Sequence, residues 1–364
     1  MLFKSFSKGA LLISRTNKFF SSLPSGHTIN CTELLLKDYG TIDKALELKQ
    51  SNLDQSKIGI NDLLVKLICA PINPADVNII QGKYGILPTQ LPSLIGNEGL
   101  FEVVETHADN SEFKKGDWVL PIQSNWGTWR SHAIANQNLF YKIPNNLDKY
   151  ACATIKVNPC TAYLMLTQFK NLKPNETIIQ NGANSAVGQA VIQLGNLMNI
   201  NVVNIVRKRE NQQELNDYLK TLGAKYIFTE DELRKSFLTQ ELWKEIPRPR
   251  FALNCVGGRA TTDMIRLLDK DSIMITYGGM SKQPLTLNTA DFIFKNFKCF
   301  GFWLTTWKKQ NPEEFKKVLD RLLDFVAKNQ LKGPKCEEFS FSDYVKAFER
   351  VQTPFVNTKI CFTS

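Results

Sequence analysis

The chain has 364 residues, 43% of them hydrophobic and 22% charged, and a formal net charge of +10. These values are typical of a globular protein of about two domains and exclude a disordered chain. No apolar run approaches the roughly 20 residues of a membrane-spanning helix, and no Lys/Arg-rich repeat with interleaved aromatic residues favours a nucleic-acid partner.

The N-terminal segment differs from the rest of the chain. It has four basic residues between Lys4 and Lys18, several serines, and no acidic residue before Glu33. This pattern is typical of a mitochondrial transit peptide, which we place at residues 1–22. A disordered basic tail is the alternative. Removal of residues 1–22 would lower the formal net charge to +6, and the remaining basicity is compatible with an acidic partner.

Residues 29–145 are expected to be rich in β-structure. Short alternating runs such as "DLLVKLICAPI" (62–72) and "GLFEVVETH" (99–107) are separated by Gly, Pro and Asn. From Ala151 onward the pattern changes. An apolar helix is expected at 161–169, and short apolar strands at 177–181, 201–206, 225–229, 251–256, 272–279 and 298–304. Strands that alternate with helices predict an α/β fold with a doubly wound parallel sheet.

A late amphipathic helix is expected after Asn311. Asn311 is a candidate N-cap and Pro312 suits the first helical position. Phe315, Leu319, Leu322 and Val326 share one apolar face.

The stretch "IIQNGANSAVGQAVIQLG" (178–195) joins a strand to a helix through small residues. Gly182, Ser185 and Gly188 keep the three-residue spacing of a dinucleotide-binding turn, but Ser replaces the usual middle glycine. The free N–H groups at such a helix start can bind a pyrophosphate. A plain strand–helix connection is the alternative.

The end of the next strand indicates which cofactor would bind. An enzyme that prefers NADH usually has an Asp or Glu about 20 residues beyond the turn, whereas Arg207, Lys208 and Arg209 stand there in this chain. Guanidinium groups can bind the additional phosphate of NADPH, so NADPH is the expected cofactor. There are two alternatives to a phosphate site. The three basic residues can be a run of charges exposed to solvent, or Glu210 can be the acidic residue of an NADH site.

Several segments together resemble the medium-chain dehydrogenase/reductase superfamily, and in particular the zinc-free mitochondrial trans-2-enoyl thioester reductases. The resemblance runs from about residue 30 to the C-terminus. It is carried by "INPADVNIIQGKYGILP" (72–88), "KVNPCTAYLML" (156–166), "QNGANSAVGQAVIQLG" (180–195), "LNCVGG" (253–258), "TYGGMSKQP" (276–284) and "GFWLTTWKK" (301–309).

The resemblance implies a two-domain organisation. A β-rich GroES-like catalytic domain would occupy residues 23–155, a Rossmann domain that binds NADPH residues 156–306, and the C-terminal return of the catalytic domain residues 307–364. A homodimer in the mitochondrial matrix is implied as well.

The resemblance also implies the reaction. Hydride from NADPH would reach C3 of an enoyl-acyl carrier protein or enoyl-CoA, and Tyr84 would be the proton donor to C2. A phenol suits this role because it is a neutral hydrogen-bond donor at pH 7. The family's cofactor-binding positions match Asn158, Asn184, Ser185, Ala186, Val187, Arg207, Lys208, Arg209, Tyr277, Gly278, Gly279, Met280, Phe302, Trp303, Leu304, Thr305 and Lys359.

No metal is expected. Zinc enzymes of the superfamily have Gly-His-Glu where this chain has Gly96-Asn97-Glu98, and an amide is a poor zinc ligand. None of the eight cysteines lies in a C-x-x-C pair.

Two other functions remain open at this point. One is a quinone or alkenal reductase on the same fold. The other is a catalytically silent protein that binds nucleotides or nucleic acid, because a fold alone does not define a function.

Overall fold

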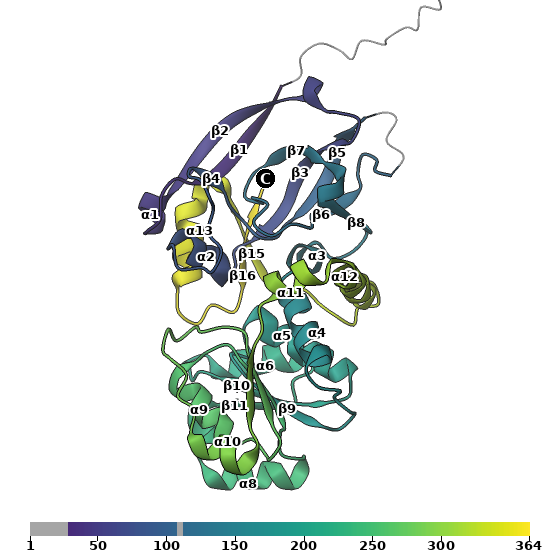
Figure 1. Ribbon diagram of the computed structural model, residues 1–364. Coiled ribbons are helices and arrows are strands. Elements are labelled where there is room, and N and C mark those ends of the chain that lie inside the picture. The colour runs from purple at the N-terminus through teal and green to yellow at the C-terminus, as the bar shows by residue number, and fades with distance from the viewer. Residues whose placement is uncertain (1–27, 108–111) are drawn as a thin grey trace, which may run out of the picture.

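The computed structural model describes residues 28–107 and 112–364, so the expected transit peptide at 1–22 lies outside the described residues. Two parts lie one above the other in Figure 1, one built on antiparallel strands and one on a parallel sheet. We refer to them as the antiparallel part and the Rossmann part.

The antiparallel part contains two sheets. The smaller has the order β2-β1-β4, and the larger has the order β15-β16-β3-β5-β6-β8 with β7 beside β3. The strands are β1 (Thr28–Leu36), β2 (Leu46–Asp54), β3 (Asp62–Pro71), β4 (Ser93–Leu94), β5 (Leu100–Thr106), β6 (Trp118–Pro121), β7 (His132–Asn136), β8 (Phe140–Ile143), β15 (Cys336–Ser340) and β16 (Lys359–Thr363).

The C-terminal segment returns to this part of the molecule. β16 pairs antiparallel with β3, with Cys361 opposite Pro71. Phe362 on β16 packs against Trp129, with ring centroids 5.4 Å apart, in the same hydrophobic cluster as Phe348 of α13 (Tyr344–Gln352). This part also contains the α-helices α1 (Ile42–Ala45) and α2 (Pro74–Ile80) and short 3₁₀ helices at Gln55–Lys57, Gln137–Leu139 and Phe341–Asp343.

The Rossmann part has one six-stranded sheet with the order β11-β10-β9-β12-β13-β14, in which all neighbours are parallel. Its strands are β9 (Thr177–Asn181), β10 (Asn201–Val206), β11 (Tyr226–Thr229), β12 (Phe251–Asn254), β13 (Ile273–Thr276) and β14 (Lys298–Gly301). The order reverses between β9 and β12, and in open parallel sheets ligands bind at such a switch point, beyond the carboxyl ends of the strands.

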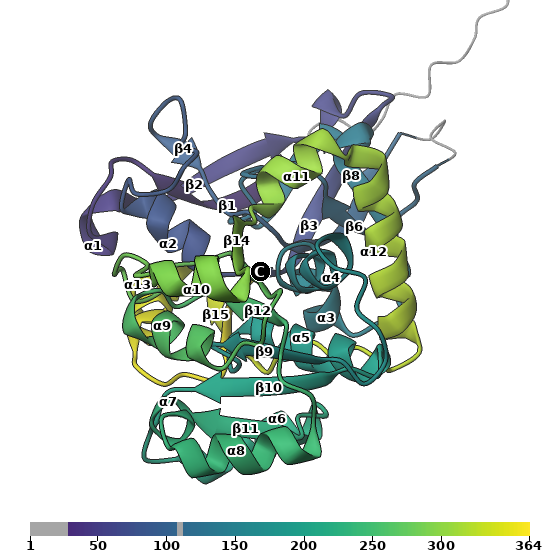
Figure 2. The same cartoon turned by 60° about the horizontal axis from the view of Figure 1, so that its bottom comes forward.

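Helices cover both faces of this sheet (Figure 2). Successive side chains of a strand point to opposite faces, and the neighbouring residues Ile178 and Ile179 accordingly belong to different hydrophobic clusters. The helices of this part are α4 (Asn158–Gln168), α5 (Ala186–Leu197), α6 (Gln212–Thr221), α7 (Glu230–Leu233), α8 (Ser236–Glu245), α9 (Gly258–Arg266) and α10 (Thr289–Lys295). Three more helices lie at the contact between the two parts: α3 (Lys149–Thr154) packs against β3 and β5, and α11 (Leu304–Gln310) leads into α12 (Pro312–Ala327), which packs against α4.

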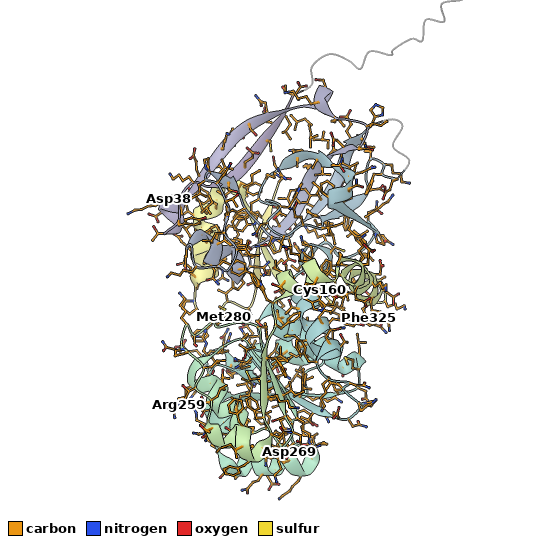
Figure 3. All side chains as sticks on the ribbon, in the orientation of Figure 1. Asp38, Cys160, Arg259, Asp269, Met280 and Phe325 are labelled. Carbon is orange, nitrogen blue, oxygen red and sulfur yellow. The ribbon has the colours of Figure 1, made fainter. Side chains whose placement is uncertain are left out.

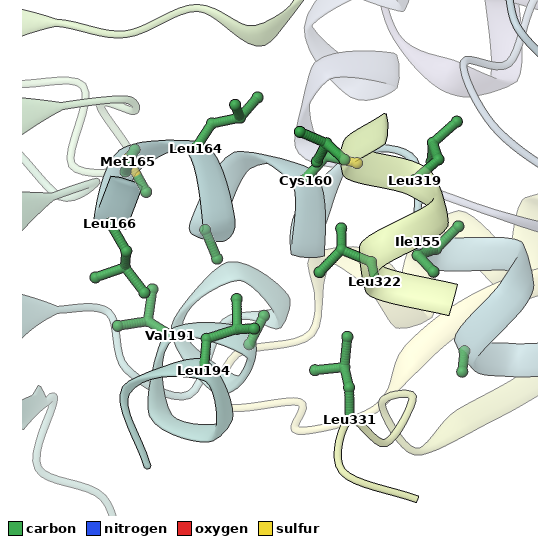
Figure 4. Packing of buried hydrophobic residues seen from close by; sticks show 14 of the residues in the cluster. Ile155, Cys160, Leu164, Met165, Leu166, Val191, Leu194, Leu319, Leu322 and Leu331 are labelled. Carbon is green, nitrogen blue, oxygen red and sulfur yellow. The ribbon is translucent and has the colours of Figure 1, made fainter. Parts of the chain in front are cut away.

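The largest cluster joins the helices at the contact between the two parts. Figure 4 shows Leu164 and Leu166 of α4, Val191 of α5, and Leu319 and Leu322 of α12 in this cluster. The four apolar residues expected on one face of α12 are all buried. Asn311 occupies the expected N-cap position of α12, but its side chain does not bond to the start of the helix, because its amide donates to the Trp307 carbonyl of α11, 2.9 Å away.

The expected α/β fold with a Rossmann sheet and a second, β-rich part is confirmed. The expected domain boundary at 306/307 lies inside α11, whereas that at 155/156 lies between α3 and α4. Among the described residues, no helix combines the length and the apolar character needed to cross a bilayer.

Candidate active site

A cavity of about 280 Å³ lies between the two parts. It is bordered by α2 and the segment after it, the starts of α4 and α5, and the segments after β13 and β14. Met280, which Figure 3 labels between the two parts, is one of its lining residues. The predicted residues that line it are Tyr84, Asn158, Ser185, Ala186, Val187, Tyr277, Gly278, Met280, Phe302, Trp303, Leu304 and Thr305. Asn184, Arg207, Lys208, Arg209, Gly279 and Lys359 do not line it.

The turn between β9 and α5 has the geometry of an anion site. The Ser185 hydroxyl caps α5 and accepts a hydrogen bond from the Gly188 N–H over 3.1 Å. Gly182 has φ +62°, and a Cβ there would lie 2.5 Å from the Cys255 sulfur. The N–H groups at the start of this 12-residue helix can therefore meet a phosphate at close range.

A buried hydroxyl beside this turn is only weakly engaged by the protein. The Tyr277 hydroxyl lies within reach of the Ser185 hydroxyl and the Cys255 thiol, but it forms a well-aligned hydrogen bond with no described residue. Burial raises the pKa of this phenol well above its usual value, so it stays neutral. Because a buried polar group without a well-aligned partner is costly, this hydroxyl fits a ligand oxygen. The open space around Gly279, where a Cβ would meet nothing within 4 Å, leaves room for that ligand. A dinucleotide thus fits the residues present.

The basic run after β10 divides into two kinds of residue. Arg207 and Lys208 are exposed, whereas Arg209 is buried. The Arg209 guanidinium donates to Asn357 Oδ1 at 2.8 Å and packs against the Phe355 ring, 5.0 Å from its centroid. Arg209 thus anchors the segment before β16, while Arg207 and Lys208 stay accessible to a phosphate.

Tyr84 meets its partner across the boundary between the two parts. Gly82, with φ +66°, turns the chain after α2, and Tyr84 follows it. The Trp303 indole N–H, which can only donate, lies 2.9 Å from the Tyr84 oxygen. The two rings meet edge to face, with centroids 5.8 Å apart. Because the phenol oxygen accepts this bond, its own O–H remains available to a group in the cavity.

Asn158 belongs to a buried amide and ion network below the cavity. Its side chain donates to Asn73 Oδ1 over 3.3 Å, and the Lys359 ammonium donates to the same oxygen. Asn73 in turn donates through Nδ2 to Glu98 Oε1 at 2.7 Å. Burial raises the pKa of Glu98 to about 7 and that of Asp76 to about 6. Lys359 thus does not line the cavity but bonds to Asn73, which does.

Asn97 stands where zinc enzymes of the superfamily have a histidine. Its Nδ2 donates to Asp76 Oδ1 at 2.7 Å, and its Oδ1 accepts from the Asn125 N–H at 3.2 Å. Both ends of the amide are thus engaged by the protein. No group of three or more His, Cys, Asp or Glu within the described ranges could hold a metal ion.

Sequence reasoning missed several lining residues, namely Asn73, Asn78, Ser124, Lys156, Thr161, Cys255 and Lys308. Thr161 lies three residues beyond Asn158 in "KVNPCTAYLML" (156–166), and Lys308 lies four residues beyond Leu304 in "GFWLTTWKK" (301–309). Helical spacing could have indicated them, because residues three or four apart share a face.

The comparisons with known proteins agree with this geometry. The family model "Alcohol dehydrogenase GroES-like domain" matches residues 59–145, and "Zinc-binding dehydrogenase" matches residues 186–324. Together with the sheet order and the cavity at the switch point, they define a medium-chain dehydrogenase/reductase.

More similar proteins identify the family within this superfamily. The chain is 42% identical to the human mitochondrial enoyl-[acyl-carrier-protein] reductase over 331 residues, which are 91% of this chain and 88% of that protein. The structure of the Etr1p/NADP/crotonyl-CoA complex has a TM-score of 0.86 at 35% identity, covering 92% of this chain and 100% of that one. The mitochondrial 2-enoyl thioester reductase Etr1p/Etr2p heterodimer from Candida tropicalis gives the same TM-score, identity and coverage. The chain therefore belongs to the mitochondrial enoyl-[acyl-carrier-protein] reductase family.

Proposed function

We propose that this protein is a mitochondrial reductase that saturates the C2=C3 bond of trans-2-enoyl thioesters with NADPH. The observation that carries the proposal is the Tyr84 phenol, which faces the cavity with its oxygen bonded to the Trp303 indole. A family relative is named a mitochondrial enoyl-[acyl-carrier-protein] reductase, and a structural relative holds NADP and crotonyl-CoA.

NADPH, when bound, supplies the hydride for C3 of the substrate. The start of α5, with Ser185, Ala186 and Val187, would hold the pyrophosphate, and the Tyr277 hydroxyl would donate to it or to the neighbouring ribose. Arg207 and Lys208 would pair with the adenosine phosphate through charge-assisted hydrogen bonds. Asn158, held by Asn73, would face the nicotinamide end.

Tyr84 would hold and then protonate the substrate. Its O–H can donate to the thioester while negative charge develops, and can then transfer the proton to C2. The phenolate oxygen that remains would keep the hydrogen bond from the Trp303 indole, which lowers the cost of losing the proton. Phe302 and Leu304 would form an apolar wall for the acyl chain.

We further propose that the protein is a homodimer that pairs through β14. β14 ends the six-stranded sheet, and its outer edge has no strand partner among the described residues. Phe300 on β14 is 45% exposed, and Ile293 and Phe294 on the preceding helix α10 are 66% and 73% exposed. An unpaired edge with exposed apolar side chains is a surface that another chain can cover.

The test of the activity is the absorbance of NADPH in the presence of protein that lacks residues 1–22. A medium-chain trans-2-enoyl-CoA should be reduced rapidly with NADPH and slowly with NADH. Consumption of NADPH with a simple quinone alone would instead support the quinone reductase alternative. NADPH binding without turnover of either substrate would support a silent binding protein.

A further inference from the structure

The charged side chains that line the cavity are all basic. Lys156 and Lys308 line the cavity, and among the described residues that line it none is acidic. Lys308 lies on α11, one turn beyond Leu304, and these two side chains border the cavity on the same helical face.

Two acidic residues, Asp76 and Glu98, lie near the cavity but do not line it. Asp76 accepts from the Asn73 N–H and from Asn97 Nδ2, both at 2.7 Å. Glu98 accepts from Asn73 Nδ2 at 2.7 Å and from the Val157 N–H at 2.9 Å. Each of the four carboxylate oxygens thus accepts a hydrogen bond from an amide of the protein, and neither acid lines the cavity. The charge of Glu98 still acts through space on Lys308 and Lys156, where it favours the protonated form of each.

Of the two lysines, Lys308 is the better placed to act as a positive charge on a ligand in the cavity. Its ammonium donates to the Ile122 carbonyl at 2.8 Å and lies 5.3 Å from the centroid of the Phe315 ring. Lys156 is fully enclosed and donates to the Pro121 and Gln123 carbonyls. Burial, followed by repulsion from Lys308, lowers the pKa of Lys156 well below its usual value. Lys308, with its pKa lowered to about 8 by burial, keeps its proton at pH 7.

We propose that the Lys308 ammonium, fixed at the cavity wall by the Ile122 carbonyl, stabilises the negative charge that develops on the thioester oxygen during reduction. This inference rests on the proposed function and adds to it a charge-stabilising residue. With NADPH bound, its hydride would form the C3–H bond and leave NADP⁺, and the C2=C3 electron pair would move onto the thioester oxygen as an enolate. The Tyr84 O–H would then give its proton to C2, which would leave a phenolate and the saturated acyl thioester.

A fixed cation suits this step for an electrostatic reason. The enolate carries a full negative charge that the enoyl thioester lacks, so a positive group acts mainly on the charged state. Inside a cavity between the two parts such a group acts more strongly than in bulk water, and its orientation costs nothing during the reaction. The charge of Lys308 should therefore affect kcat more than KM.

The first experiment measures the charge effect without turnover. 3-Oxobutanoyl-CoA forms an enolate that absorbs in the ultraviolet, and we would titrate it with the protein and oxidised cofactor. Bound to the wild type, its apparent pKa should fall by about 1–3 units.

Lys308→Arg should preserve the shift. Lys308→Gln can still bond to the Ile122 carbonyl but has no charge, and should lose the shift. Lys309→Gln removes an exposed charge from the adjacent position and is the matched control.

The second experiment is the pH profile of kcat/KM. The Lys308 ammonium faces Glu98, Lys156 and the Cys160 thiol. With a pKa of about 8, Lys308 loses its charge as the pH rises through that value, and activity should fall with it. Lys308→Arg should move this fall to higher pH. At pH 7, Lys308→Gln should lower kcat roughly a hundredfold with unchanged NADPH affinity.

The outcomes separate this inference from the function on which it rests. Equal enolate shifts and equal kcat in Lys308→Gln and the wild type would overturn the inference and leave the reductase intact. Failure of the wild type to reduce any enoyl thioester would overturn the proposed function instead.

Discussion

At the scale of single residues, the Tyr84–Trp303 pair is the arrangement with the most direct chemical consequence. The indole occupies the phenol oxygen as a donor, so the phenol proton points elsewhere. The pair also joins two segments that lie 219 residues apart and belong to different parts of the molecule. Any change in how these parts pack would therefore alter the position of the proposed proton donor.

Replacement of Tyr84 by Phe should lower kcat by about 10²–10⁴-fold, because a general acid in the transition state contributes about that much. NADPH affinity, measured by fluorescence titration, should stay the same. Tyr226→Phe removes a distant hydroxyl that bonds to Glu245 and serves as the control. Unchanged kcat in Tyr84→Phe would remove this phenol from the mechanism.

The basic run after β10 gives a second prediction at this scale. Arg207→Ala combined with Lys208→Ala should weaken NADPH binding about 10- to 100-fold and leave NADH binding nearly unchanged, since charge-assisted bonds to one phosphate are lost. Arg209→Ala should lower the melting temperature and affect both cofactors equally, because its guanidinium holds the segment around Asn357. Isothermal titration with both cofactors is the measurement. Equal losses for NADPH and NADH in the double variant would contradict this assignment.

At the scale of elements, the β9–α5 unit depends on the absence of a side chain at Gly188. A Cβ at Gly188 would lie 2.6 Å from the Ala183 carbonyl oxygen and 2.7 Å from its carbonyl carbon. Both atoms belong to the backbone of the turn itself. A side chain at this position would therefore push the turn away from the start of the helix that is proposed to hold the pyrophosphate.

Gly188→Ala should destabilise the protein by about 1–3 kcal/mol, the usual cost of overpacking, and should weaken NADPH binding. Thermal unfolding with and without NADPH measures both effects. Gly279→Ala is the control for stability, because its Cβ would meet nothing within 4 Å. A melting temperature of Gly188→Ala equal to that of the wild type would show that the turn can relax.

The elements also show which predictions were within reach of the sequence. The segments 177–181 and 201–206 were expected as strands and are strands β9 and β10 with the same bounds. Their length, apolar character and flanking small residues are local signals. Asn311 is the N-cap residue of α12 as expected, but its side chain donates to the Trp307 carbonyl of the preceding helix α11 and not to the start of α12. No local pattern around Asn311 indicates that competing bond.

At the scale of the whole molecule, the C-terminal segment returns to the larger antiparallel sheet and reaches the region beside the cavity. β16 pairs with β3, and Lys359 at its start reaches the buried network below the cavity. The two parts thus share both a hydrophobic cluster and a network of amides and charges. The site lies where these two shared regions meet.

The proposed dimer can be tested at the same scale. Phe300→Lys combined with Ile293→Lys places charges on the exposed edge, and the mass in analytical ultracentrifugation should fall from two chains to one. Phe237→Lys adds a charge to another exposed aromatic position, on α8, and should leave the mass unchanged. A wild-type protein that sediments as a single chain would rule out the dimer.

The amino-acid sequence by itself determined the α/β class, the family and the identity of many residues around the cavity. These features depend on local periodicity, on turn residues and on motifs that lie within short segments. The tertiary structure alone decided which side chains meet. The contacts between Tyr84 and Trp303, between Arg209 and Asn357, and between Lys308 and the Ile122 carbonyl each join segments at least 148 residues apart in the chain. Burial then decides which charges remain at the cavity wall, and burial follows from how the two parts pack.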